Sequence, residues 1–254
     1  MKRIDLNCDM GEMPEHISDG TQEALMRSIT SVNIACGGHA GDAQTMATTI
    51  EQAVRHKMAI GAHPGYADRA NFGRIELNLS PEEVADSVYA QVRALAEIAA
   101  RYHANVTHVK PHGALYNQAV HNAQLARAIA SGVASWSHDV VLVGLAGSPM
   151  LDVFDDAGFP IAAEAFADRR YEPDGTLRSR KHADALIEDP AEAAQQALSI
   201  VQGRVVARDG SEAPLHADTL CIHSDTPGSP QIAAQVAKAL REAGFIVTPL
   251  TLSK

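Results

Sequence analysis

Reactive side chains follow almost every short apolar run in this 254-residue sequence. They are carboxylates, imidazoles, a lysine and an arginine, the groups that enzymes use to move protons and to stabilise developing charge. Lys110 and His112 come directly after the run Val106–Val109. Lysine is among the residues least often buried without a partner, so Lys110 is the strongest single candidate. The other candidates are Asn7, Asp9, Glu12, Cys36, His39, His63, Asp168, Arg169, His223 and Asp225.

Each candidate also has a structural explanation. Asp9 and Glu12 could cap or solvate a turn that leads into a helix, because acidic residues are common there. A single histidine such as His39 or His63 is more often a core or rim residue than a catalytic one. Coincidence is a poor explanation when six run ends carry such residues, so the set as a whole predicts one active site.

Three glycines add a second signal. The segment Cys36–Asp42 contains Gly37, Gly38 and Gly41, which would let backbone N–H groups approach an anion at the start of a helix. The segment His223–Ser229 offers hydroxyls and amides for another polar group, or it is simply a turn.

A metal site is also possible from the residue types. Asp9, His39 and His63 would supply a carboxylate and two imidazoles, a set that suits zinc or another divalent ion. These three residues lie far apart in the sequence, so the sequence alone does not show whether their side chains meet.

The apolar runs predict βα units and a parallel sheet. The predicted strands are Ile4–Asn7, Val32–Ala35, Ala59–Ala62, Val106–Val109, Val140–Val143, Ile161–Ala165 and Thr219–Ile222, with Ile246–Pro249 as a possible eighth. In a barrel all carboxyl ends of the strands meet on one face, whereas an open sheet spreads them along an edge. Reactive residues at so many strand ends therefore favour a closed α/β barrel in a single domain over residues 1–254.

Helix signals separate these strands. Ser80 to Glu83 and Asp189 to Glu192 both read as a capping box with proline at the first helical position. After the first box, an apolar stripe runs from Val84 to Ala99 at helical spacing. The least regular region is Arg169–Asp184, which we predict to be a mobile loop over the site.

Composition and missing motifs exclude several functions. The formal net charge is −10, which argues against binding nucleic acid or anionic lipid. The sequence has no 18-residue apolar run and no signal-peptide pattern, and its three cysteines form no CxxC pair, so we expect a cytoplasmic protein. It also lacks the P-loop, the GxGxxG fingerprint and the GxSxG nucleophile elbow, which disfavours P-loop, dinucleotide and serine-hydrolase chemistry.

The chain resembles the LamB/YcsF family. The segments that carry the resemblance span the chain in order: DLNCDMGE (5–12), NIACGGHAGD (33–42), IGAHPGYAD (60–68), HVKPHGALYN (108–117), EAFADRRY (164–171) and CIHSDTPGS (221–229). Two departures are Ile75, where the family usually has an arginine, and Ser224, where it usually has a glycine. The resemblance implies a slightly irregular, seven-stranded (β/α) barrel like that of the sugar deacetylases.

The resemblance also implies an activity, which is the ATP-dependent opening of the lactam 5-oxoproline to L-glutamate together with partner subunits B and C. Under this hypothesis Lys110 and His112 stabilise phosphoryl or oxyanion charge, assisted by the loop Gly37–Gly41. The other catalytic candidates would be bases, Mg²⁺ ligands or acids, namely Asp9, Glu12, His39, His63 and Asp225. The residues expected to bind substrate are Asn7, Gly38, Asp168, Arg169 and His223.

Two alternatives come from other functional classes. A metal-dependent amide or sugar deacetylase would use the same type of barrel with a hydrolytic metal site. A non-catalytic subunit would bind the substrate and present it to partners.

Overall fold

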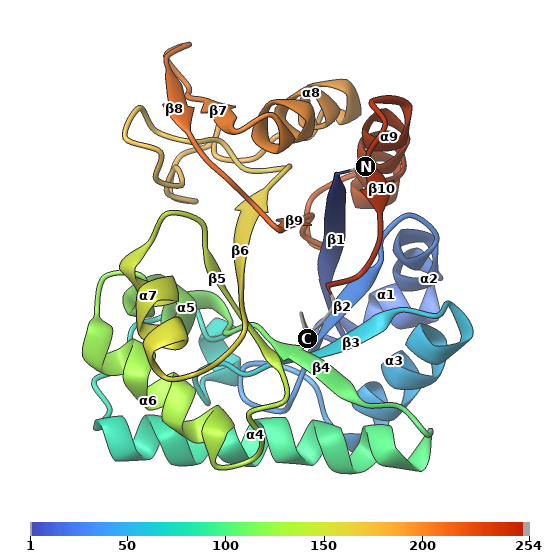
Figure 1. The fold of residues 1–254 in the computed structure, drawn as a ribbon. Helices are drawn as coiled ribbons and strands as arrows, with labels where there is room; N and C mark the ends of the chain where they lie inside the picture. Colours follow the sequence, from blue (N-terminus) through green and yellow to red (C-terminus); the bar gives the residue numbers. More distant parts are fainter. Residues whose placement is uncertain (1, 251–254) are drawn as a thin grey trace.

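The computed structural model describes residues 2–250 and contains a closed parallel barrel surrounded by helices (Figure 1). Seven strands form the barrel, and β9 closes it by pairing with both β6 and β1. In chain order the strands are β1 (Arg3–Met10), β2 (Ser31–Ala35), β3 (Ala59–His63), β4 (Val106–Val109), β5 (Val141–Leu145), β6 (Ile161–Phe166) and β9 (Thr219–Cys221). The predicted barrel and its seven main strands are therefore confirmed, with ends that differ by a few residues.

Polar side chains fill the inside of the barrel. Asn7 on β1 donates to Glu164 on β6, and His108 on β4 bonds to Asn33 on β2. These pairs join strands that are not neighbours, so the side chains must point toward the barrel axis. Most (β/α) barrels fill this space with branched apolar residues instead. The interior is thus a connected hydrogen-bond network that extends to the carboxyl ends of the strands.

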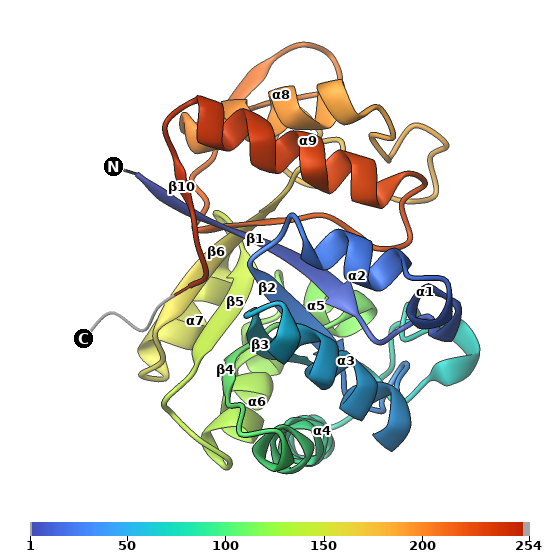
Figure 2. The same ribbon diagram turned by 90° about the vertical axis from the view of Figure 1, so that its right-hand side faces the viewer.

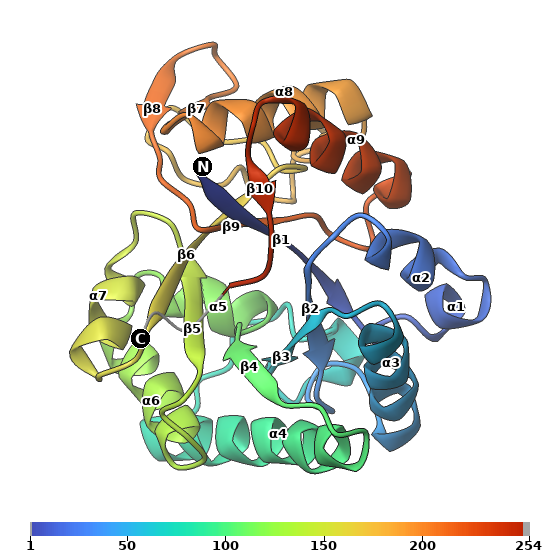
Figure 3. The same cartoon turned by 45° about the vertical axis from the view of Figure 1, so that its right-hand side comes forward.

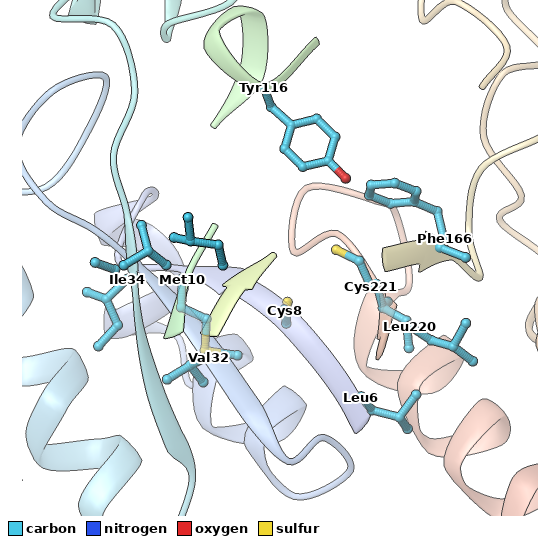
Figure 4. Close-up of a cluster of buried hydrophobic side chains, with 14 of the residues drawn as sticks. Leu6, Cys8, Met10, Val32, Ile34, Tyr116, Phe166, Leu220 and Cys221 are labelled. Carbon is cyan, nitrogen blue, oxygen red and sulfur yellow. The ribbon is translucent and has the colours of Figure 1, made fainter. Parts of the chain in front are cut away.

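The apolar side chains of the same strands point outward to the helices. Alternate residues of a strand face opposite sides, so Leu6, Cys8 and Met10 of β1 lie on the face opposite to Asn7. Figure 4 shows Met10 and Cys8 near Val32 and Ile34 of β2, with Leu6 toward Leu220 of β9. All six apolar residues are buried. The hydrophobic core of this protein therefore lies between the barrel and its helices.

The helices cover the outside of the barrel (Figures 2 and 3). They are α1 (Pro14–Ser18), α2 (Thr21–Met26), α3 (Ala43–Arg55), α4 (Pro81–Arg101), α5 (Gly113–Ala119), α6 (Ala123–Ala134), α7 (Pro149–Asp156), α8 (Pro190–Val201) and α9 (Ser229–Glu242). Helix α4 packs against α6, and α8 packs against α9. None of the helices within residues 2–250 combines the length and the apolar character that a membrane span requires.

The two predicted capping boxes have different outcomes. At α4 the box is complete, because Ser80 and Glu83 satisfy each other's backbone N–H groups, and the stripe from Val84 to Ala99 is buried as predicted. At α8 only half forms. Asp189 caps the helix, but the carboxylate of Glu192 pairs with Arg170 instead of returning to the cap. A nearby guanidinium outcompetes the backbone amide for this carboxylate.

Two small strand pairings lie outside the barrel. The segment predicted as a possible eighth strand forms only β10 (Ile246–Val247), which pairs with the first residues of β1. It does not join the barrel, because β9 already occupies that edge of β1 further along. An antiparallel hairpin, β7 (Arg204–Val206) and β8 (Glu212–Pro214), was not predicted.

Gly61 on β3 faces the barrel interior, where it leaves room for an imidazole. A Cβ at this position would lie 2.1 Å from Nε2 of His108. We expect Gly61→Ala to displace His108 from Asn33 and to lower the free energy of unfolding by about 2–4 kcal/mol. Chemical denaturation followed by circular dichroism measures this loss, and an unchanged midpoint would contradict the close packing.

Candidate functional site

A cavity of about 790 Å³ lies at the carboxyl ends of the barrel strands. The candidate residues that line it are Asp9, Glu12, His63, Lys110, His112, Arg169, His223 and Asp225. The irregular segment after β6 also reaches it with Leu177–Lys181. The structure thus brings eight of the sequence candidates to one cavity and places the irregular loop at its wall.

Lys110 lines this cavity and is buried. Its Nζ lies 2.8 Å from Oε1 of Glu164 and 3.0 Å from Oδ1 of Asp9. It also lies 3.2 Å from Sγ of Cys221. Glu164 is held in turn by the hydroxyl of Tyr116, at 3.1 Å. A lysine that follows β4 therefore sits between carboxylates from β1 and β6.

The pKa values of this group follow from its charges. Burial alone would lower the pKa of Lys110, but the attraction of Asp9, followed by that of Cys221 and Glu164, raises it well above its usual value. Burial would raise the pKa of Asp9, but the charges of His63 and Lys110 lower it well below its usual range. The lysine is therefore an ammonium ion and Asp9 a carboxylate near neutral pH.

Three histidines surround the carboxylate of Glu12. Its Oε1 lies 2.9 Å from Nε2 of His39, 3.2 Å from Nδ1 of His112 and 3.7 Å from Nε2 of His63. His63 and His112 also lie 3.0 Å apart, between Nε2 and Nδ1. Burial lowers the pKa of His39 to about 4, so that ring is neutral at pH 7.

Two groups of side chains place ligand atoms close enough to bind a metal ion. One is Glu12 with the three histidines, and the other is Asp9 with Cys221 and His223. The sequence-based set of Asp9, His39 and His63 is thus divided between them. Glu12 and His112 complete the first group instead.

Three arginines line the same cavity as the lysine. Arg74, from the segment after β3, and Arg180, from the irregular loop, both pair with Oδ2 of Asp225, at 2.7 and 2.9 Å. Arg169 is buried beside them, and its Nε has no hydrogen-bond partner among the described residues. Burial and then the charge of Arg180 lower the pKa of Arg169 to about 10. It remains charged at neutral pH, and no carboxylate of residues 2–250 forms an ion pair with it.

Four sequence candidates support the site from behind the cavity wall. Asn7 bonds to Glu164, and Asp168 accepts from the backbone N–H and Nδ1 of His223, at 2.9 and 3.0 Å. His39 packs behind His112, with the two rings stacked at 3.6 Å. Gly38 is also buried, and a Cβ there would lie 2.6 Å from the carbonyl oxygen of Gly65. These four residues hold their neighbours in position and do not line the cavity.

The glycine segment does not present a free helix start. Asp42 caps α3 with its own carboxylate and forms a capping box with Thr45. The carbonyl oxygens of Gly37 and Gly41 accept hydrogen bonds from Arg69. The amides expected to hold an anion are therefore not part of the cavity lining.

Sequence reasoning missed several residues of the site. Glu164, Tyr116, Arg74 and Arg180 lie at the cavity or contact Lys110 or Asp225 directly. Glu164 sits within the predicted strand Ile161–Ala165, and a carboxylate inside an apolar run was the available signal. Arg74 and Arg180 come from irregular segments that carry no periodic pattern.

The buried His108 predicts a dependence of stability on pH. Burial, and then the charge of Lys110, lower its pKa to about 3, whereas an unfolded histidine titrates near 6.5. Below about pH 6.5, His108 is protonated in the unfolded chain but stays neutral in the folded chain. The free energy of unfolding therefore falls by about 1.4 kcal/mol per pH unit. We expect the stability difference between the parent and His108→Gln to narrow by about 2–3 kcal/mol between pH 6.5 and 4.5. Urea unfolding at both pH values measures it, and a constant difference would contradict the prediction.

Comparison with known proteins identifies the relatives of this chain. The A subunit of 5-oxoprolinase from Chloroflexus aggregans is 48% identical over 248 residues, covering 97% of this chain and 98% of that protein. The corresponding protein of the same name from Methylococcus capsulatus is 47% identical over 98% of this chain and 96% of its own length.

Solved structures agree with the sequence comparison. A lactam utilization protein from Thermus thermophilus superimposes with a TM-score of 0.90 at 39% identity, covering 97% of this chain and 99% of that one. A family 4 carbohydrate esterase from Streptomyces lividans shares the fold, with a TM-score of 0.52 at 11% identity over 98% of this chain and 93% of that one. The predicted likeness to the deacetylase barrel is thus confirmed at the level of the fold.

The family model for LamB/YcsF proteins matches residues 4–254, in agreement with the resemblance of the six sequence segments. The chain belongs to the LamB/YcsF family.

Proposed function

We propose that this chain is the A subunit of a 5-oxoprolinase and opens 5-oxoproline to L-glutamate with ATP as co-substrate. The observation that carries the proposal is the buried Lys110, held between Asp9 and Glu164 in a cavity that Arg74, Arg169 and Arg180 also line. A small ligand with a carboxylate and a polar carbonyl matches a cavity with these cations. The names of the relatives that share nearly the full length of the chain support the same reaction.

The chemistry of a lactam explains the need for ATP. An amide in a five-membered ring is a poor electrophile. Transfer of the γ-phosphoryl group to its carbonyl oxygen converts that oxygen into a leaving group. A first water then attacks the carbon, and the ring C–N bond breaks to leave γ-glutamyl phosphate. A second water hydrolyses this acyl phosphate, so that inorganic phosphate leaves as the γ-carboxylate of glutamate forms. Negative charge develops on the oxygen at each stage, so fixed cations stabilise the transition states.

The residues of the site suit these steps. The ammonium group of Lys110 would stabilise charge on the lactam oxygen. Arg169, with Arg180 beside it, would hold the carboxylate of 5-oxoproline. His223 lines the cavity with its Nδ1 held by Asp168, and it would transfer protons to and from the attacking water and the ring nitrogen. Mg²⁺ would accompany the nucleotide.

The decisive experiment measures glutamate release from 5-oxoproline by the chain alone and with partner subunits B and C. We expect release only when ATP and all three subunits are present, with ADP formed in step with glutamate. Glutamate release without ATP, or an unchanged rate when this chain is omitted, would refute the proposal.

A metal-dependent amide or sugar deacetylase is the second candidate. The gathering of Glu12, His63 and His112 at the cavity favours it, because two imidazoles and a carboxylate form a known catalytic metal set. Such an enzyme would hydrolyse an N-acetyl substrate without ATP and would lose activity on chelation. Acetate release from N-acetylated sugars, assayed with and without ATP, separates the two functions.

A further inference from the structure

His63 and His112 each direct one ring nitrogen toward the other. Nδ1 of His63 lies 2.7 Å from the carbonyl oxygen of Lys110, and Nε2 of His112 lies 2.9 Å from that of Phe72. A carbonyl oxygen only accepts, so both of these nitrogens must carry the hydrogen. In the neutral rings the other two nitrogens, 3.0 Å apart, are therefore both lone-pair acceptors. Two facing lone pairs at this distance repel each other, so either a proton or a metal ion must lie between them.

A third acceptor completes a triangle with these two nitrogens. Oε1 of Glu12 lies 3.2 Å from Nδ1 of His112 and 3.7 Å from Nε2 of His63. Zinc binds nitrogen and oxygen ligands at about 2.0–2.1 Å, which sets two tetrahedral ligands roughly 3.3 Å apart. The three observed edges, 3.0, 3.2 and 3.7 Å, bracket this separation.

We propose that Nε2 of His63, Nδ1 of His112 and Oε1 of Glu12 bind a divalent metal ion of the zinc class. All three residues line the cavity, so the fourth position of a tetrahedral ion would face the space that receives the ligand. Three protein ligands with one open position are the pattern of catalytic rather than structural zinc sites. The backbone carbonyls that fix both imidazoles are the supporting contacts that metal-bound histidines usually have. This inference goes beyond the proposed lactam opening, which does not require the ion.

His39 is a supporting residue and not a fourth ligand. Its ring is stacked on His112 with an angle of 6° between the planes and 3.6 Å between the centroids. An imidazole binds a metal in the plane of its ring, and two parallel stacked rings do not share an in-plane point. His39 instead donates from Nε2 to Oε1 of Glu12 and so fixes the carboxylate.

The experiment uses the full chain, stripped of metal with a chelator and titrated with Zn²⁺ by calorimetry and with Co²⁺ by visible absorption. We expect one equivalent of Zn²⁺ and the intense absorption of tetrahedral Co²⁺. The variants His63→Gln, His112→Gln and Glu12→Gln should each lose the site. His39→Gln should keep the stoichiometry and bind about 10–100-fold more weakly, as expected for a supporting residue.

The control is His223→Gln, which removes a cavity histidine outside the proposed set and should leave Zn²⁺ binding unchanged. Thermal unfolding of every variant in chelator checks that it folds. Absence of one stoichiometric site in the parent chain, or its loss in His223→Gln with retention in His112→Gln, would overturn the proposal. Because the readout is metal binding, failure here is distinguishable from failure of the glutamate-release assay.

Discussion

Replacing Lys110 with alanine is expected to abolish ATP-dependent glutamate release by the assembled complex. The ammonium group lines the cavity, and no other cationic side chain of the described residues forms ion pairs with both Asp9 and Glu164. Loss of one preorganised group that stabilises an oxyanion typically costs about 10²–10³-fold in kcat. Turnover measured by coupled glutamate detection checks this, with the assembled complex verified by size-exclusion chromatography.

This substitution also leaves the buried Glu164 without its cation and takes one of two cations from Asp9, which costs about 3–5 kcal/mol of stability. The double variant Lys110→Met with Glu164→Gln removes one charge of each sign. It should regain most of the stability but none of the turnover. Near-normal turnover in either variant would remove Lys110 from the chemistry.

Arg169→Gln is expected to raise KM for 5-oxoproline about 10–100-fold with a smaller effect on kcat. Arg169 is buried at the cavity with an unpartnered Nε, and a charged hydrogen bond to a carboxylate is worth about 1.5–3 kcal/mol. The control Arg204→Gln removes a guanidinium from the exposed hairpin β7–β8, where it pairs with Glu212, and should leave KM unchanged.

A second substrate tests whether the carboxylate is the recognised group. The lactam 2-pyrrolidinone lacks the carboxylate, so its binding should be weak in the parent chain and unaffected by Arg169→Gln. Binding of both lactams is measured by competition against 5-oxoproline turnover. An equal loss for both ligands would show that Arg169 acts on the architecture of the cavity and not on the carboxylate.

The barrel could be predicted because its evidence is local. Each strand is a short apolar run, and most runs end in a reactive residue whose position follows from the direction of the strand. The polar interior was not predictable in the same way. Asn33 and His108 look like isolated polar residues inside strands, and only the closed barrel brings their side chains together.

The candidate site shows the same division. Lys110, Asp9 and His112 follow regular strands, and the structure places them at one cavity. Gly38 and His39 follow a strand too, but tight packing against Gly65 and His112 occupies them. Arg180 lies in a segment without periodicity, so its position depends on tertiary contacts such as the one to Asp225 that no sequence pattern records.

Asp225 is an internal counter-ion for two of the arginines that line this cavity. One carboxylate neutralises two guanidinium groups that come from different segments of the chain, Arg74 and Arg180. An anion that binds here must compete with the carboxylate of Asp225 for Arg180. The binding free energy that it gains from Arg180 is therefore smaller than an unpaired arginine would give. Displacement of Asp225 would break the ion pairs that link the segments after β3, β6 and β9. An anion that displaces Asp225 from these arginines would therefore also break a link between three segments at the cavity.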